Sequence, residues 1–202
     1  MMNDDMALVR EFAANQSEEA FQTLVSRHLN LVYSSALRQV RDEHLAQEIA
    51  QATFIILARK ASSLSDKTIL SGWLYRTAQF AAADALKMQR RRQMREQEAF
   101  MQATTFPNET ESTWEQLSPF LDEAMARLRD EDRDALVLRF FENKNLKEVG
   151  AALGLEERAA QKRVARGLEK LRSFFARRGV ESTTASIAEK ISAHSVHAAP
   201  VA

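Results

Sequence analysis

The segment from Leu146 to Phe175 carries two helical patterns separated by a single Gly-Leu break. The first pattern places Leu146, Val149 and Leu153 on one helix face, and Gly154 supplies the permissive backbone of a tight turn. The second pattern stays within one narrow stripe of a longer helix. Its members are Ala160, Val164, Leu168, Leu171 and Phe175. The segment therefore predicts two packed helices joined by a short turn.

Long cations lie opposite the stripe of the second helix. Arg158, Lys162 and Arg166 are each four residues apart, and the small residue Ala165 lies beside them. This layout is typical of a recognition helix that enters the major groove of DNA. A solvated basic face on an ordinary helix would look the same, so both interpretations stay open on this segment alone.

Composition limits the class of protein. The 202 residues include only 5 Gly and 3 Pro, and 45% are hydrophobic, as expected for a mostly helical globular chain. The absence of Cys excludes disulfides and thiolate chemistry and favours a cytoplasmic location. The acidic first residues predict no signal peptide. No apolar run approaches the roughly 20 residues of a membrane span, so we expect no membrane insertion.

The net charge is zero, but the charges are unevenly distributed. One basic cluster runs from Lys87 to Arg95, a second from Arg158 to Arg178, and acidic residues gather between Glu109 and Asp134. Two separate basic clusters indicate two contacts with DNA.

Helical periodicity predicts an all-α fold of two small domains. We expect the first domain at residues 1–98, a flexible acidic linker at 99–116 around Pro107, and the second domain at 117–178. Residues 179–202 are small and polar, which predicts a flexible tail with one weak helix at 186–192.

Two blocks in this order resemble the extracytoplasmic-function (ECF) sigma factors of the sigma-70 family of bacterial RNA polymerase. "HLAQEIAQATFIILARKA" followed by "GWLYRTAQFAAADALKMQRRR" is similar to the family's region 2, and "LRDEDRDALVLRFFENKNLKEVGAALGLEERAAQKRVARGLEKLR" is similar to its region 4. The similarity extends over about residues 6–178 and is most specific at 73–76 and 163–171. It implies that the second domain is a helix-turn-helix, winged-helix-like but without the wing.

The resemblance also implies which residues bind which partner. It implies binding to core RNA polymerase, at its clamp coiled coil and flap regions, through Glu48, Gln51, Phe54 and Ile55. The implied contacts with −10 promoter DNA are Trp73, Tyr75, Arg76, Phe80, Lys87, Arg90, Arg91 and Arg92. The implied contacts with −35 DNA are Arg158, Gln161, Lys162, Arg163, Ala165 and Arg166.

Residue chemistry agrees with these roles and also offers simpler readings. Strand opening needs aromatic faces on which unstacked bases can stack, and cations that bind phosphates. Stacking of one base on an aromatic side chain contributes roughly 1–3 kcal/mol of binding free energy. Trp73, however, adjoins an inward stripe, so packing in the core is an equal alternative for it. The apolar run at Phe54 and Ile55 can likewise pack inside the first domain. The inward stripe comprises Leu70, Leu74, Ala78, Ala81 and Ala85.

We therefore expect a sigma factor that directs core polymerase to promoters, with an anti-sigma protein as a candidate partner. No enzyme, metal site or cofactor is expected, because the four His residues lack ligand spacing and no glycine-rich phosphate loop exists. The main alternative is a polymerase-independent helix-turn-helix regulator that binds its operator as a dimer. A helical partner-binding module is a third reading, but it leaves the two basic clusters unexplained.

Overall fold

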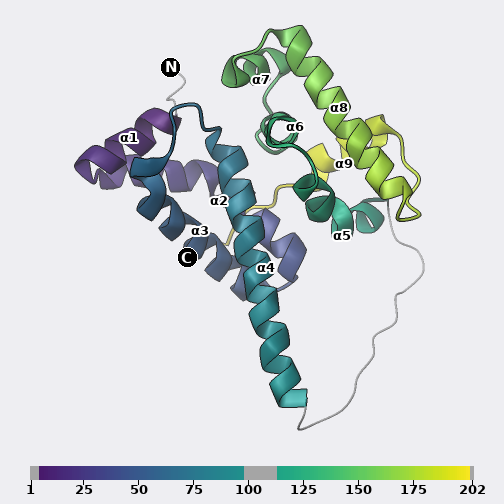
Figure 1. Ribbon diagram of the computed structural model, residues 1–202, viewed down its shortest axis with the longest axis horizontal. Coiled ribbons are helices and arrows are strands. Elements are labelled where there is room, and N and C mark those ends of the chain that lie inside the picture. Colours follow the sequence, from purple (N-terminus) through teal and green to yellow (C-terminus); the bar gives the residue numbers. More distant parts are fainter. Residues whose placement is uncertain (1–4, 98–112, 201–202) are drawn as a thin grey trace.

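The computed structural model describes residues 5–97 and 113–200, with side chains described for 5–90 and 114–200. Within these ranges all regular structure is helical, which confirms the all-α prediction (Figure 1). Arg91 and Arg92 lie on a helix, but their side chains are outside the described part. The predicted linker falls largely on residues 98–112, which also lie outside it.

The first domain consists of helices α1 (Asp5–Asn15), α2 (Glu18–Val40), α3 (Glu43–Lys60) and α4 (Leu70–Gln97), with the short turn η1 (Ala61–Ser63) after α3. The Ser17 side chain caps α2 by accepting from the Ala20 N–H, and Asp42 caps α3 by accepting from the Leu45 N–H. The predicted inward stripe of α4 lies in or against this domain's core.

The second domain begins with α5 (Thr113–Ala126), four residues before the boundary expected from the sequence. It continues through α6 (Asp130–Leu136), the π-helical turn η2 (Val137–Phe141), α7 (Leu146–Leu153) and α8 (Glu157–Ala176). The predicted stripe of α8 is buried over its whole length, because α8 packs on α5, α6, α7 and α9 (Thr184–His194). This result confirms the helical hairpin.

The turn between α7 and α8 is built from local chemistry. Asn145 and Glu148 form a reciprocal capping box at the start of α7. Gly154 ends that helix with φ +65°, a left-handed conformation that favours glycine. A Cβ added at Gly150 would lie 2.6 Å from the carbonyl oxygen of Leu155, so the chain can pass this closely only at a glycine.

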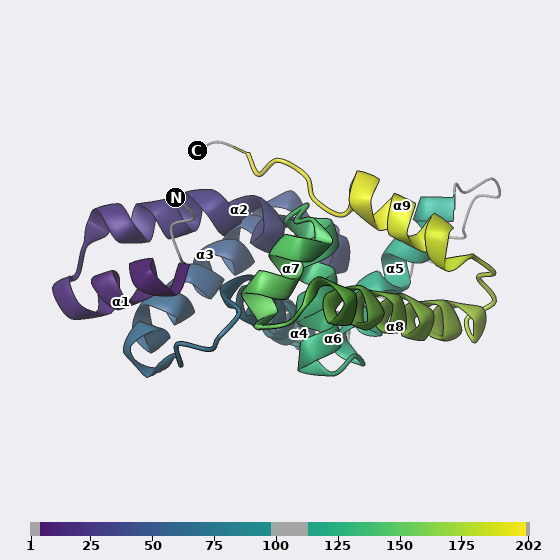
Figure 2. The same ribbon diagram turned by 90° about the horizontal axis from the view of Figure 1, so that it is seen from above.

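The structure differs from the sequence expectation after residue 179. A further helix, α9 (Thr184–His194), packs on α5 and α8, with Ile187 and Ile191 buried. The following residues cross to α2 of the first domain (Figure 2). The predicted weak helix is therefore longer than expected, and the segment is docked rather than flexible, because two isoleucines anchor it.

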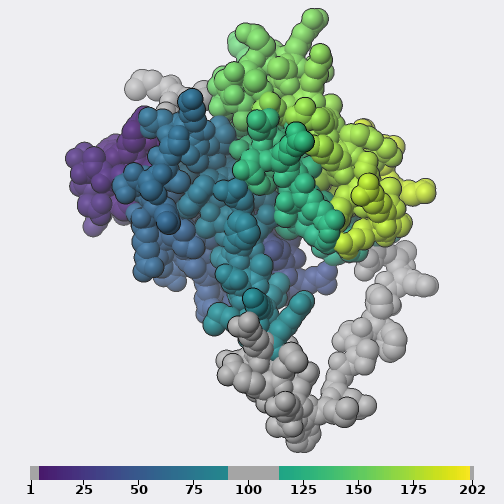
Figure 3. Space-filling view, viewed as in Figure 1, coloured from purple at the N-terminus to yellow at the C-terminus, as the bar shows by residue number. Residues whose placement is uncertain are grey.

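The two domains pack directly on each other. Leu31 of α2 and Tyr75 of α4 belong to the same buried cluster as the core of the second domain. The Tyr75 and Phe141 rings meet edge to face with their centroids 5.3 Å apart. In the space-filling view the blue surface of the first domain meets the green surface of the second along a continuous boundary (Figure 3).

Replacing Gly150 with Ala should destabilise the second domain. Alanine favours a helix interior by about 1 kcal/mol over glycine, but the new Cβ would collide with a backbone oxygen that cannot move away freely. We expect a net loss of about 1–3 kcal/mol, measured as a lower midpoint of thermal unfolding. The neighbouring exposed substitution Ala151→Ser is the control, and equal stability of the two variants would contradict this packing.

Candidate nucleic-acid interface

The outer face of α8 is exposed and cationic. Arg158, Gln161, Lys162 and Ala165 are all exposed, on the sides of the helix that the buried stripe leaves free. The short side chain of Ala165 leaves room for close approach between the longer ones. This face therefore has the shape and charge to enter a DNA groove.

Two further candidates on α8 are held by acids of α6. Arg163 pairs with Glu131 at 3.1 Å, and Arg166 forms a bidentate pair with buried Asp132. Lys170 also donates to Asp132, at 2.6 Å. Burial acts to raise the pKa of Asp132, but the hydrogen bonds from Arg166 and Lys170 outweigh it and lower that pKa. These bonds fix the angle of α8 and leave the Arg166 side chain half exposed.

On α4, some of the candidates point outward. Phe80 is 66% exposed, an unusual environment for a phenylalanine, and Lys87 and Arg90 are exposed further along the helix. Trp73 is half-buried against the core of the first domain, so both of its predicted roles stay compatible with the structure.

Tyr75 differs from the expectation of a DNA contact. Its side chain is fully buried, and its hydroxyl donates to Asp122 of α5 at 2.5 Å. In this arrangement Tyr75 is a core residue at the boundary between the domains and has no surface to offer a base. Arg76 next to it pairs with Asp130 of α6 at 3.1 Å, so it too faces the second domain.

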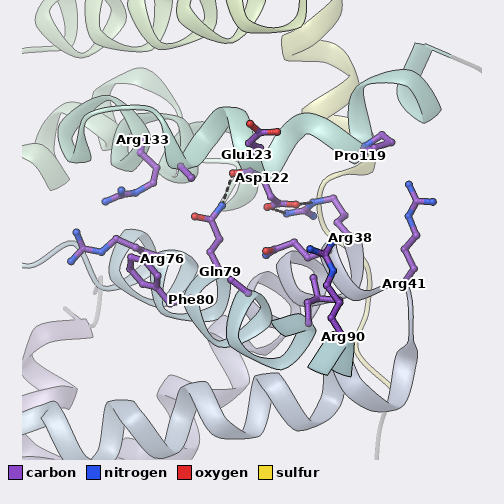
Figure 4. Close-up of a pocket in the computed structure, with 14 residues that line it drawn as sticks. Arg38, Arg41, Arg76, Gln79, Phe80, Arg90, Pro119, Asp122, Glu123 and Arg133 are labelled. Carbon is purple, nitrogen blue, oxygen red and sulfur yellow. Dashed lines mark hydrogen bonds and ion pairs between the residues drawn. The ribbon is translucent and has the colours of Figure 1, made fainter. Parts of the chain in front are cut away.

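Asp122 collects hydrogen bonds from two helices of the first domain. Arg38 donates from Nε to Oδ2 at 2.9 Å and from Nη2 to Oδ1 at 3.2 Å. Gln79 donates to the backbone carbonyl of Asp122 at 2.9 Å (Figure 4). Burial and the adjacent Asp122 carboxylate raise the pKa of Tyr75 well above its usual value of 10, so its hydroxyl keeps its proton and donates.

Asp134 makes a second close contact between the domains. Its carboxylate fills the space above Gly72 of α4, where an added Cβ would lie 2.1 Å from Oδ1. Burial raises the pKa of Asp134 to about 6. The nearby positive charges of Arg133 and Arg76 only partly oppose that rise, and the negative charge of Asp130 adds to it.

A cleft of about 620 Å³ opens between α4 and α5 beside these contacts (Figure 4). Phe80 lines it together with five arginines, and Asp122 and Glu123 are its acidic lining residues. Aromatic surface next to the exposed cations Arg41 and Arg90 suits a single nucleic-acid strand, although α5 closes one side of the cleft. The arginines are Arg38, Arg41, Arg76, Arg90 and Arg133.

The candidate polymerase contacts on α3 separate into two groups. Glu48 and Gln51 are exposed, and Ile55 is 45% exposed, so these three share an accessible surface. Phe54 differs from the expectation, because it is 6% exposed and packs in the core of the first domain. Phe54 therefore supports α3 from behind in this structure.

The sequence analysis missed Arg38 and Asp122. The apolar residues near each of them in the sequence are ordinary core residues, and neither Arg38 nor Asp122 forms part of a recognisable motif. The available signal was weak: Asp122 lies between the buried residues Leu121 and Ala124 on α5, next to the exposed Glu123. Among the described residues, no group of three or more His, Asp or Glu is arranged to hold a metal ion.

Two helical domains each present exposed cations on one helix, an arrangement typical of proteins that bind DNA at two surfaces. Comparison with protein families gives the membership of this chain. Residues 24–92 match the model of sigma-70 region 2, and residues 124–173 match that of sigma-70 region 4. The chain belongs to the ECF sigma factors of the sigma-70 family, which are specificity subunits of RNA polymerase and not enzymes.

Two relatives found by sequence comparison agree with this membership. The RNA polymerase sigma factor CarQ of Myxococcus xanthus is 32% identical over 161 residues, 79% of this chain and 91% of CarQ. The ECF sigma factor SigE of Mycolicibacterium smegmatis is 30% identical, over 81% of this chain and 64% of SigE. The chain is also similar to a solved structure of CnrH in complex with the cytosolic domain of CnrY. That match covers 86% of this chain and 98% of the matched chain, with 19% sequence identity and a TM-score of 0.41.

None of the described helices has the length and apolar character needed to cross a membrane.

Replacing Asp134 with Asn should stabilise the chain in a pH-dependent way. The folded pKa of about 6 exceeds the ordinary 3.8, so the folded chain binds a proton that the unfolded chain releases between these values. Stability therefore falls as pH rises through this window, by at most about 3 kcal/mol. Asparagine removes that loss, so its advantage in thermal midpoint should be largest above pH 6 and shrink steadily below it.

The matched control is Asp84→Asn, which removes an exposed carboxylate from α4. Thermal unfolding of the three proteins at several pH values between 4 and 8 makes the comparison. An Asp134→Asn advantage that is the same at every pH would contradict a buried, ionising carboxylate against Gly72.

Proposed function

We propose that this chain directs RNA polymerase to promoters by holding two DNA elements with α4 and α8. The observation that carries this proposal is the position of the exposed cations. They lie on one helix in each of the two matched sigma-70 regions, with an exposed phenylalanine beside the first set.

In this proposal α8 binds the −35 element as duplex. Arg158, Gln161 and Lys162 reach base edges or phosphates in the major groove, and Ala165 allows close approach. Arg163 and Arg166 act at the flank, where their acidic partners Glu131 and Asp132 orient them toward the phosphate backbone.

The −10 element is bound as a single strand along α4. Phe80 supplies a flat apolar surface on which a base can stack, and Lys87 and Arg90 supply charge for phosphates. We keep Arg91 and Arg92 in this set from the sequence alone. Trp73 and Arg76 stay candidates, and Tyr75 joins them only if the domains separate.

Core polymerase is bound through the exposed surface of α3. Glu48, Gln51 and Ile55 together offer an acid, an amide and an apolar side chain, a combination suited to packing against helices of a partner. These residues are exposed while the domains are packed together, so this surface is available in the closed arrangement.

Binding both elements requires the domains to separate. The −10 and −35 elements are about 25 base pairs apart, which corresponds to about 85 Å of B-DNA. A compact chain of this length has a radius of gyration of only about 17 Å. The packed domains cannot span that distance, so promoter binding must break the contacts of Asp122 and Asp134.

The dimeric regulator loses its basis, because it needed an effector or dimerisation domain where the region 2 match lies. We place the activity in the cytoplasm, where bacterial polymerase and DNA meet. An anti-sigma partner stays a prediction of the sequence resemblance.

Transcription from a random promoter library tests the function directly. Core polymerase is assayed with and without this chain, and the transcribed sites are sequenced. We expect initiation only when the chain is present, at sites that share two spaced elements. Initiation that does not depend on the chain, together with tight duplex binding by the chain alone, would favour a polymerase-independent regulator instead.

Removing two cations from α8 should weaken promoter binding in a salt-dependent way. The double variant Arg158→Ala/Lys162→Ala loses two contacts in which a cation displaces counterions from DNA. We expect the slope of log affinity against log salt concentration to fall by about 1 for each lost phosphate contact, measured by fluorescence anisotropy with holoenzyme and a promoter duplex. Lys60→Ala, at the far end of α3, is the control. An unchanged slope would show that α8 does not bind DNA through these residues.

A further inference from the structure

Residues 183–199, here termed the strap segment, lie outside both matched regions and are anchored in the second domain. Thr183 caps α9 by accepting from the Ser186 N–H at 3.1 Å. Ile187 and Ile191 are fully buried in the core cluster of the second domain. His194 lies against Trp114 of α5, with ring centroids 5.4 Å apart. The strap segment is therefore an integral part of the second domain at this end.

The other end of the strap segment is bound to α2 of the first domain. Ser34 donates its hydroxyl to the carbonyl of His197 at 3.1 Å and accepts from the N–H of the same residue at 2.7 Å. Asn30, one turn earlier on α2, accepts from the Ala199 N–H at 2.9 Å. Ala199 also packs against the core of the first domain. The extended backbone thus runs along one face of α2 (Figure 2).

Arg38 joins this binding site to the contact between the domains. Its guanidinium donates to Asp122 of α5 and, through Nη1, to the backbone carbonyl of buried Ser195. One buried side chain of α2 is therefore shared between the strap segment and the carboxylate that holds Tyr75. Release of either partner leaves donors of Arg38 without an acceptor, which couples the two contacts.

We propose that the strap segment is an intramolecular inhibitor, which holds the domains closed and keeps part of α4 from promoter DNA. This inference rests on the proposed function for its effect on DNA, but not for its effect on the arrangement of the domains. The strap segment binds one domain through apolar burial and the other through backbone hydrogen bonds. It keeps the second domain at high effective concentration beside α4, and opening must break its bonds to α2.

The test removes only the α2 end of the strap segment. The double variant Asn30→Ala/Ser34→Ala deletes the partners of Ala199 and His197 and leaves the core of the second domain intact. The matched control, Gln22→Ala/Ser26→Ala, changes two exposed residues of the same helix outside the strap contacts. A chain that ends at Glu181 removes the whole strap segment, but it uncovers the sites of Ile187 and Ile191 and is used only if circular dichroism shows it folded.

Two measurements are made on each protein without polymerase. Because the chain has no cysteine, Gln47→Cys on α3 and Ala151→Cys on α7 give a unique pair of spin labels, and double electron–electron resonance measures the distance between the domains. Binding of a fluorescent single-stranded DNA of mixed sequence reports access to α4. We expect the strap variant to shift to longer, broader distances and to bind the strand about tenfold more tightly than the control, as the loss of a few hydrogen bonds predicts.

Each contrary outcome overturns a stated part of the proposal. Distances that match the control would overturn the strap segment as a link between the domains, whatever the DNA result. Longer distances with unchanged strand affinity would overturn its role as an inhibitor of DNA binding. Failure of the proposed function is seen separately, as the absence of chain-dependent initiation by every variant, including the wild type.

Discussion

The buried carboxylate of Asp122 links two helices of the first domain of this sigma factor to α5 of the second. Asp122 of α5 accepts from Arg38 and from Tyr75, and its backbone carbonyl accepts from Gln79. Removing one partner of a buried ion pair typically costs about 3–5 kcal/mol, whereas separating both into water restores their hydration. Such an ion pair fixes one arrangement of the two domains while they are packed, and it costs less free energy to separate both partners into water than to leave one of them buried alone. It therefore suits a contact between domains that must separate.

The contacts between the domains involve α4, the same helix that is proposed to bind the −10 strand. Tyr75, Arg76 and Gln79 face the second domain, while Phe80, Lys87 and Arg90 stay accessible on other parts of α4. The closed chain therefore exposes the faces of α8 and α3 that are proposed to bind duplex DNA and polymerase, but only part of the surface of α4 that is proposed to bind the melted strand. On this proposal, promoter DNA and the second domain compete for the same surface of α4.

Local periodicity predicted the helices and their buried faces well. The stripes from Ala160 to Phe175 and from Leu70 to Ala78 are buried as expected, because a repeat near 3.6 residues leaves a chain few other ways to cover its apolar side chains. Periodicity says nothing about which domain covers a given residue. Tyr75 and Phe54 were assigned to partners and are buried within the chain itself. The docking of residues 183–199 was missed for the same reason, since two isoleucines in a polar stretch give too weak a pattern to reveal the surface that they cover.

The distance between the domains in the free chain and on a promoter tests the central claim most directly. Single-molecule fluorescence energy transfer between a donor on α3 and an acceptor on α7 reports this distance. The labelled protein keeps all of the residues that form the contacts between the domains. We expect high transfer in the free chain, since the domains are packed, and almost none in the complex of chain, core polymerase and promoter, where the two DNA elements lie about 85 Å apart. High transfer in the promoter complex, or low transfer in the free chain, would contradict a closed sigma factor that opens on DNA.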